Sequence, residues 1–251
     1  MLGLGEAGRR IAADLAAAGA DVRGFDPAGA ADVPGVTVAP DAGRAVAGCD
    51  VVLSVNTARA ALDAARSAVP ALDQEVVYAD LNTASPELKQ ELERVIVATG
   101  ASFADVALLG PVPARGLRTP VVASGPGAQA FADALGPLGM PVEVVSGQAG
   151  DAAALKLLRS VFMKGLAAAA IESVEAADAA GHADWVKREI AAVIGDPLLE
   201  RLLEGSRRHA ARRTDEMEAA KELLLRLGVE PRIAAASAAV LAAFTDTPPE
   251  A

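Results

Sequence analysis

Three glycines near the amino terminus constrain the fold of this chain more than any other feature. Gly3, Gly5 and Gly8 stand in the segment G-L-G-E-A-G, a helical stretch at 9–18 follows them, and Asp26 ends the next apolar run. In a βαβ unit the first glycine allows a tight turn, the second lets a pyrophosphate approach the backbone, and the third lets helix and strand pack closely. The spacing therefore predicts a dinucleotide-binding unit, with a helix N-terminus facing the phosphates. The predicted cofactor-binding residues are Gly3, Leu4, Gly5, Glu6, Ala7, Gly8 and Asp26.

The acidic residue at the end of the second strand favours NAD over NADP. A carboxylate at this position accepts a hydrogen bond from the ribose 2′-hydroxyl and repels a 2′-phosphate. No arginine closely follows Asp26. Arg9 and Arg10, however, lie near the glycine loop and are candidates to bind a phosphate, which leaves NADP open.

The strand that normally precedes this glycine motif is almost missing, because only Met1 and Leu2 come before Gly3. Loss of the innermost strand would leave its neighbours without hydrogen-bond partners. We therefore expect a truncated first strand, and a misassigned start or a trimmed chain explains it better than a biological loss.

Length, composition and charge restrict the classes of partner. The 251 residues, 52% of them hydrophobic, suffice for one large or two modest domains with a full core. The formal net charge of −10 argues against nucleic acid and anionic membrane surfaces, which need a basic face. No apolar run reaches the roughly 18 residues of a membrane-spanning helix, and the amino terminus does not resemble a signal peptide. We expect a cytoplasmic protein that binds small molecules.

The few cysteines and histidines predict no metal centre. The single Cys49 precedes an apolar run, as a buried structural thiol would, and His182 and His209 complete no zinc-binding pattern with it. The carboxylates show no metal-loop spacing either. We therefore assign neither metal nor cysteine chemistry.

The order of the apolar segments predicts a Rossmann-type α/β domain followed by an all-α domain. Short β-branched runs alternate with alanine-rich helical stretches, which is typical of a doubly wound, mostly parallel sheet. The predicted strands are 36–38, 50–55, 76–80, 102–108, 120–124 and 142–145. After Gly147 the pattern is helical, over 151–180, 183–194, 197–226 and 231–244. We therefore predict an NAD(P)-binding domain over 1–146 and a helical substrate and dimerisation domain over 147–251.

The first helix of the second domain carries three polar residues on one face. Lys156, Ser160 and Lys164 are spaced by four, so they fall within about 80° of one another on a helix. One interpretation is a pair of lysines whose aliphatic stems cover the core while their ammonium groups reach water. The other is a polar seam that faces the cofactor domain.

These motifs resemble the β-hydroxyacid dehydrogenase family, which includes 3-hydroxyisobutyrate and 6-phosphogluconate dehydrogenases. G-L-G-E-A-G is similar to the family's opening motif, and A-D-L-N-T-A-S-P at 79–86 resembles its D-x-S-T-x-x-P substrate motif. F-A-D-V-A-L-L-G at 103–110 resembles its D-A-P-V-S-G segment. The resemblance covers the whole chain and looks like a little-characterised branch with its own helical C-terminal domain.

The resemblance implies roles for residues beyond the glycine motif. It implies that Lys156 is the catalytic lysine, that Asn82 and Thr83 contact substrate, and that Asn56 and Thr57 lie beside the nicotinamide ribose. It also implies a homodimer formed through the helical domain. Substrate contacts have changed, because Asn82 and Leu109 replace family serines, Pro111 follows the third motif, and Ser160 replaces an asparagine.

The mechanism that we expect uses Lys156 as general acid and base. Desolvation and the nearby positive charge of Lys164 should disfavour its ammonium form, so that the neutral amine can take a hydroxyl proton. Ser160, with Asn82 or Thr83, would hold the substrate oxygen.

A basic cluster supplies candidates for binding an anionic substrate. It consists of Arg207, Arg208, His209, Arg212 and Arg213. One interpretation is a solvated helix face paired with Asp215, Glu216 and Glu218. The other is that Arg212, Arg213 or His209 binds a carboxylate or phosphate, with Lys164 contributing to the same anion site.

Three functions follow from these observations. The first is an NAD(P)-dependent dehydrogenase or reductase that acts on a small anionic hydroxy or oxo acid. The second is a nicotinamide-binding regulatory protein without turnover, which the truncated strand and the changed family residues suggest. The third is an imine reductase, but such enzymes usually lack a lysine at this position, so Lys156 favours alcohol or carbonyl chemistry.

Overall fold

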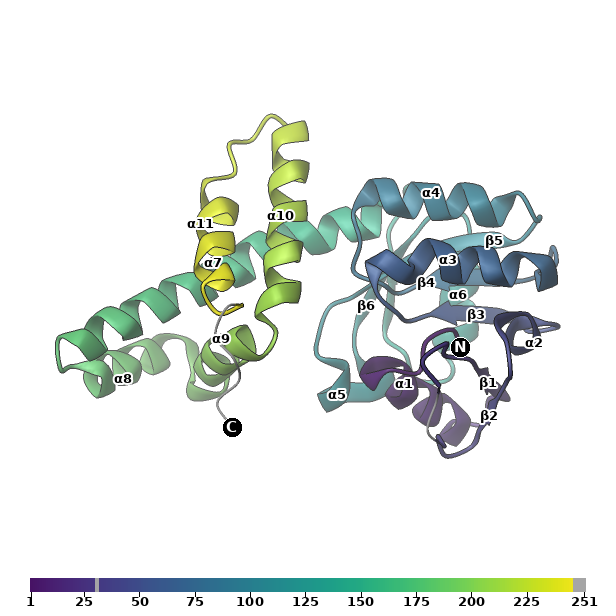
Figure 1. Cartoon of the computed structure of the whole chain (residues 1–251), viewed down its shortest axis with the longest axis horizontal. Helices are drawn as coiled ribbons and strands as arrows, with labels where there is room; N and C mark the ends of the chain where they lie inside the picture. Colours follow the sequence, from purple (N-terminus) through teal and green to yellow (C-terminus); the bar gives the residue numbers. More distant parts are fainter. Residues whose placement is uncertain (30–31, 246–251) are drawn as a thin grey trace. The chain divides into compact units, whose positions relative to one another are not determined.

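Parallel strands alternate with helices in the amino-terminal part of the chain (Figure 1). The computed structural model describes residues 1–29 and 32–245. They form two compact units, Met1–Lys156 and Leu157–Ala251, which divide within the long helix α7 (Asp151–Ala179). The strands are β1 (Val22–Gly24), β2 (Val36–Val38), β3 (Val51–Ser54), β4 (Val77–Asp80), β5 (Ser102–Leu108), β6 (Val121–Ser124) and β7 (Val142–Val144).

The strand order confirms the predicted Rossmann-type α/β fold. β1 pairs with β2, and the other five strands lie in the order β3-β4-β5-β6-β7. Neighbours are parallel except β5 and β6, which are antiparallel. The sheet is therefore mostly parallel, as the alternation of strand and helix patterns predicts.

The first residues of the chain connect β1–β2 to the larger sheet. Leu2 N donates to Leu53 O at 2.8 Å, and Val55 N donates to Leu2 O at 2.8 Å. On the other side Gly3 N donates to Phe25 O at 2.8 Å. Leu2 forms isolated parallel bridges with Phe25 and Ser54, so a very short segment occupies the position of the innermost strand.

Side chains alternate between the two faces of the sheet and make two apolar cores. Leu53 and Val77 pack with residues of α1, whereas Val52 and Tyr78 pack with residues of α3 and α4. The helices of this unit are α1 (Glu6–Ala17), α2 (Ala42–Val46), α3 (Ala58–Ala68), α4 (Pro86–Val97), α5 (Val112–Arg115) and α6 (Ala128–Leu135), with 3₁₀ turns at Val69–Ala71 and Gly116–Arg118.

The second unit is helical throughout its described residues. After α7 come α8 (Ala183–Ile194), α9 (Asp196–Arg208), α10 (Ala210–Arg226) and α11 (Arg232–Ala242). The prediction of one helix over 197–226 is wrong, because the backbone leaves the helical region at His209, with φ −122° and ψ 29°. Both flanking segments favour helix, and the break gives each its own buried face, with Leu202 on α9 and Met217 on α10. α10 and α11 lie side by side (Figure 1).

Within residues 1–29 and 32–245, no helix combines the length and the apolar character that a bilayer crossing requires.

Candidate functional site

The glycine loop is shaped by two glycines and left open by the third. Gly3 has a φ of +97°, and a Cβ there would lie 2.2 Å from Val55 O. A Cβ at Gly8 would lie 2.1 Å from Gly3 O. A Cβ at Gly5, by contrast, would meet nothing within 4 Å. The fold requires Gly3 and Gly8, whereas Gly5 keeps free the approach that a pyrophosphate needs.

Helix α1 begins in this loop and presents its N-terminus to the open space. Gly5 is the N-cap, and among the described residues no side chain caps the helix. The amides of the first helical turn have no partners within the helix, and they carry the positive end of the helix dipole. They are suited to bind the phosphates of a dinucleotide.

Asp26 is fixed by two backbone amides. Its Oδ2 accepts a hydrogen bond from Leu4 N at 2.8 Å, and its Oδ1 accepts one from Ala28 N at 3.0 Å. One anchor lies in the glycine loop and the other follows β1, so the carboxylate has a defined orientation. Each oxygen keeps capacity for another donor. A carboxylate with such free capacity can accept a hydrogen bond from a ribose hydroxyl.

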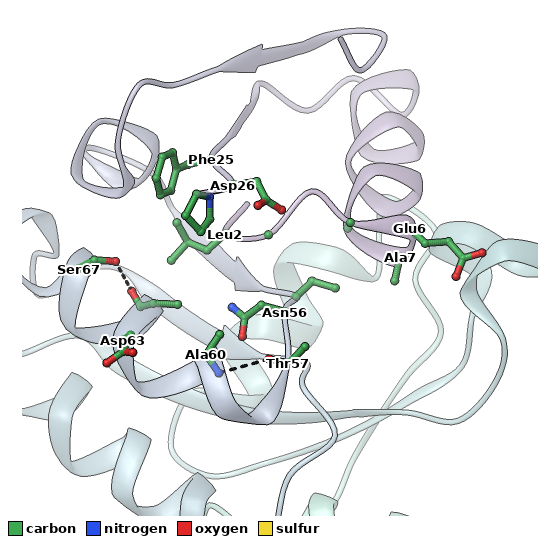
Figure 2. A pocket seen from close by; sticks show the side chains of 16 residues that line it. Leu2, Glu6, Ala7, Phe25, Asp26, Asn56, Thr57, Ala60, Asp63 and Ser67 are labelled. Atoms are coloured by element: carbon green, nitrogen blue, oxygen red, sulfur yellow. Dashed lines mark hydrogen bonds between the residues drawn. The ribbon is translucent and has the colours of Figure 1, made fainter. Parts of the chain in front are cut away.

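A cavity of about 670 Å³ joins these elements, and Figure 2 shows Asp26 on one side of it and Asn56 and Thr57 on the other. Every predicted cofactor residue lines the cavity except Leu4, whose side chain is buried. Sequence analysis missed part of the lining, which is Leu2, Phe25, Pro27, Val55, Ala60, Asp63, Ala64 and Ser67. They come from the first residues of the chain, the segments that follow β1 and β3, and helix α3, so only tertiary folding brings them together.

A hydrogen-bond network organises the opposite wall. Asn56 N donates to Asn82 Oδ1 at 2.5 Å, and Asn56 Nδ2 donates to Ser54 Oγ at 3.0 Å. The buried Oδ1 of Asn56 has no partner among the described residues. It is therefore an acceptor that a ligand can satisfy. The open Gly5, the anchored Asp26 and this unpaired oxygen together fit a nicotinamide dinucleotide.

Lys156 and Thr83 meet within the first unit. The first turns of α7 belong to that unit, and Lys156 Nζ donates to Thr83 Oγ1 at 2.6 Å. Thr83 follows Asn82, whose Nδ2 donates to Ser54 Oγ at 3.1 Å and to Asp80 Oδ2 at 2.5 Å. The structure thus brings Lys156 to the turn that carries the two predicted substrate residues.

Ser160 and Lys164 belong to a second cluster, within the helical unit. Ser160 Oγ donates to Glu216 Oε1 at 2.5 Å, while Lys164 Nζ lies 2.9 Å from Glu216 Oε2 and 3.1 Å from Ser160 Oγ. Burial lowers the pKa of Lys164; Glu216 opposes this effect, and the charges of Arg213 and Arg212 add to it. Sequence analysis gave Glu216 no part in this cluster, because 56 residues separate it from Ser160.

The arginines of the basic cluster have different surroundings. Arg213 Nη1 donates to Ser206 Oγ at 2.6 Å, and burial lowers the pKa of Arg213. Arg207 lies over the ring of Phe244, 5.4 Å from its centroid. Arg212 is exposed, so its guanidinium is accessible to a solute anion.

Comparison with known families identifies the amino-terminal unit. Residues 1–135 match the family described as the NAD-binding domain of 6-phosphogluconate dehydrogenase. The match covers more than half of the 251 residues. The chain belongs to this family. Residues 177–244 match a domain of unknown function, DUF1932, which agrees with a branch that has its own helical C-terminal domain.

Two uncharacterised proteins are similar to this chain over most of its length. A conserved hypothetical protein of Sinorhizobium meliloti is 30% identical, with a TM-score of 0.74 over 96% of this chain and 86% of that one. An uncharacterised 28.5 kDa protein of Methanothermus fervidus is 28% identical over 78% of this chain and 76% of its own.

A neighbour of known activity shares the fold. The 3-hydroxyisobutyrate dehydrogenase of Mycobacterium tuberculosis, solved with L-serine, is 21% identical, with a TM-score of 0.80 over 97% of this chain and 92% of that one. The resemblance to the β-hydroxyacid dehydrogenases is therefore confirmed at the level of family and fold. The first unit is an NAD(P)-binding domain of an oxidoreductase fold.

Proposed function

We propose that this chain is an NAD(P)-dependent dehydrogenase or reductase that interconverts the hydroxyl and carbonyl groups of a small anionic hydroxy or oxo acid. Bound nicotinamide supplies or accepts the hydride, so the protein must orient the reacting carbon and move one proton. The observation that carries the proposal is the hydrogen bond of 2.6 Å between Lys156 Nζ and Thr83 Oγ1, in the unit that holds the dinucleotide cavity.

In this proposal Lys156 is the general acid and base. Its amine takes the hydroxyl proton during oxidation and its ammonium returns that proton during reduction. Thr83 accepts from Lys156, so its own hydroxyl proton remains to be donated to the substrate oxygen. Asn82 already uses both amide protons, on Ser54 and Asp80. We therefore assign the oxygen contact to Thr83, and to Asn82 the shaping of the turn and of the Asn56 loop.

We propose NAD as the preferred cofactor. The Asp26 carboxylate is held in place by Leu4 N and Ala28 N, so it cannot readily turn away from a 2′-phosphate. The negative charge would repel that phosphate while accepting from a 2′-hydroxyl.

We assign the anionic group of the substrate to Lys164 and Arg212. Arg212 is exposed, and Lys164 has one carboxylate partner, Glu216, against two neighbouring arginines. An added carboxylate or phosphate would relieve this excess of positive charge. Ser160, which bonds both Lys164 and Glu216, would hold this arrangement in place.

We further propose that the chain acts as a homodimer. Helix α7 exposes Leu155, Leu158 and Phe162, with relative exposures of 44%, 39% and 69%. Their spacing places them on one face of the helix, and burial against a second copy would remove this apolar surface from water.

The test combines cofactor titration with a substrate panel. NADH and NADPH binding is followed by fluorescence, and hydride transfer by absorbance with 3-hydroxy and 3-oxo acids. We expect Lys156→Ala to lower kcat about 10²- to 10⁴-fold while cofactor affinity stays within about twofold. Lys187→Ala, which removes an exposed lysine, is the matched control and should leave both unchanged.

Each other outcome points to a different function. Retained turnover in Lys156→Ala would refute the role of the lysine. Cofactor binding without turnover by either protein would favour a regulatory protein. Amine-dependent oxidation of the reduced cofactor would indicate an imine reductase.

A further inference from the structure

A row of buried polar residues crosses four neighbouring strands. Ser54 pairs in register with Asp80, Asp80 with Asp105, and Asp105 with Ser124. All four are fully buried, with 0% exposure. Residues in register point to the same face of a sheet, so their side chains form one continuous polar row inside an apolar core.

Helix α4 supplies a buried cation to this row. Lys89 is 1% exposed and shares the buried face of α4 with Leu92 and Ile96. Its Nζ donates to Asp80 O at 2.7 Å and Asp80 Oδ1 at 2.6 Å, and it lies 3.1 Å from Asp105 Oδ1. Two ammonium protons therefore have acceptors on Asp80, and the Asp105 carboxylate forms an ion pair with the same ammonium. Burial disfavours the ammonium, but Asp80 and then Asp105 outweigh it and raise the pKa of Lys89.

The two carboxylates hold different segments of the candidate site. Asp80 Oδ2 accepts from Asn82 Nδ2 at 2.5 Å, in the turn that continues to Thr83. Asp105 Oδ2 accepts from Gly150 N and Ala153 N, each at 3.0 Å. It therefore caps the first turn of α7, with Ser124 Oγ accepting from Ala152 N at 2.9 Å.

We propose that Lys89 is a positioning residue, which joins the turn of Thr83 to the start of α7 and thereby sets where Lys156 meets Thr83. This inference rests on the proposed function for its catalytic consequence. Lys89 binds both carboxylates at once, and each carboxylate is bonded to one of the two segments. Lys156 lies one helical turn beyond Ala153, so the orientation of the α7 start is passed directly to its side chain.

Charge explains why an apolar side chain would not serve here. Without the ammonium, two carboxylates on adjacent strands would face each other in a buried core. One of them would take up a proton or move apart from the other. Either change would alter the hydrogen bonds to Asn82 or to the α7 amides.

The test uses a variant that keeps the net charge of the cluster, because Lys89→Met alone leaves two carboxylates without a cation. Lys89→Met combined with Asp105→Asn keeps this net charge and an oxygen acceptor for the α7 amides, and removes the ammonium that links the two carboxylates. Leu92→Ala on the same helix is the control for lost stability, because Leu92 is fully buried and outside the polar row.

Two readouts separate positioning from stability. The pH midpoint for acetylation of Lys156 by trace acetic anhydride should shift by at least about 0.5 pH unit in the double variant. The reason is that the groups around the Lys156 amine are no longer held in one arrangement. Lys187 serves as internal reference. With a substrate that the panel identifies, kcat should fall about tenfold to hundredfold while KM and cofactor affinity hold.

The outcomes are distinct. An unchanged Lys156 midpoint, or an equal effect of Leu92→Ala on the midpoint or on kcat, would overturn the role of Lys89. If the wild type turns over no substrate, the proposed function fails, and the acetylation midpoint still decides whether Lys89 positions Lys156.

Discussion

Each unit of this protein holds a lysine that is mostly shielded from solvent, and the two lysines differ in the charges around them. Lys89, in the first unit, has two carboxylates within 3.1 Å, and they raise its pKa. Lys164, in the second, lies partly buried beside Glu216 and near Arg213 and Arg212, and this burial lowers its pKa. The ammonium form is therefore favoured at Lys89 and disfavoured at Lys164.

The partners of these lysines differ in how firmly they are held. Lys89 binds groups on adjacent strands of a sheet, one of them a backbone carbonyl. Lys164 binds two side chains, Ser160 on its own helix and Glu216 on α10. The contrast indicates that Lys89 is part of the framework. In the proposed anion site, Lys164 would be the cation that exchanges a partner for an incoming anion.

The largest expected effect is on stability. Lys89→Met should lower the free energy of unfolding by about 3–5 kcal/mol, because it leaves a buried carboxylate unpaired. Lys164→Met should lower it by about 1–2 kcal/mol, since Ser160 still donates to Glu216. Urea titrations measure both, with the single tyrosine, Tyr78, reporting on the first unit and the single tryptophan, Trp185, on the second.

The control is Lys187→Met at an exposed position, which should change stability by less than about 0.5 kcal/mol. Equal losses for the two buried lysines would break the distinction between a framework cation and an exchangeable one.

Sequence reasoning predicted the parts of the candidate site that depend on local spacing. Gly3, Gly5 and Gly8 lie within six residues at the start of α1, and all three line the cavity. The polar row was missed because Asp80 and Asp105 become neighbours only through strand register. A local signal did exist for Lys89, because its spacing places it on the same helix face as the apolar Leu92 and Ile96. The sequence could not identify the residues that Lys89 binds.

The second unit illustrates the same limit. Helix propensity is high on both sides of His209, so the composition of 197–226 did not reveal the break that the fold introduces there. The Ser160–Glu216 contact depends on how α7 and α10 pack, which periodicity within either helix cannot specify.

A variant of intermediate expected effect tests whether the glycine loop binds the cofactor. Gly5→Ala should weaken NADH binding about tenfold to hundredfold, because the added methyl group occupies the approach of the pyrophosphate. Unfolding midpoints at Tyr78 and Trp185 should stay unchanged, since a Cβ at Gly5 meets no protein atom within 4 Å. Isothermal titration with NADH measures the affinity.

Gly8→Ala is the contrasting variant, because its Cβ would lie 2.1 Å from Gly3 O and must distort the loop. It should lower stability as well as affinity. Unaltered NADH binding by Gly5→Ala would show that the glycine loop is not part of the cofactor site.

The smallest expected effect is a difference in pH dependence between the two lysines. A lysine whose folded-state pKa is lowered binds fewer protons in the folded than in the unfolded state, at pH values between the two pKa values. Lys164 should therefore make the second unit more stable as pH rises toward the unfolded lysine pKa of about 10.4. Lys89, with a raised pKa, contributes stability that is complete below about 10.4 and is lost only above it, as pH passes through its folded-state pKa.

Unfolding of the wild type and of Lys164→Met is followed at Trp185 from about pH 7 to pH 9.5. The difference between their free energies of unfolding isolates this contribution, because groups common to both proteins cancel. We expect the wild type to gain stability relative to Lys164→Met as pH rises. The Lys89→Met comparison at Tyr78 should show no such gain. A flat difference for Lys164 would mean that Glu216 fully compensates its burial, and the two lysines would then be equivalent framework cations.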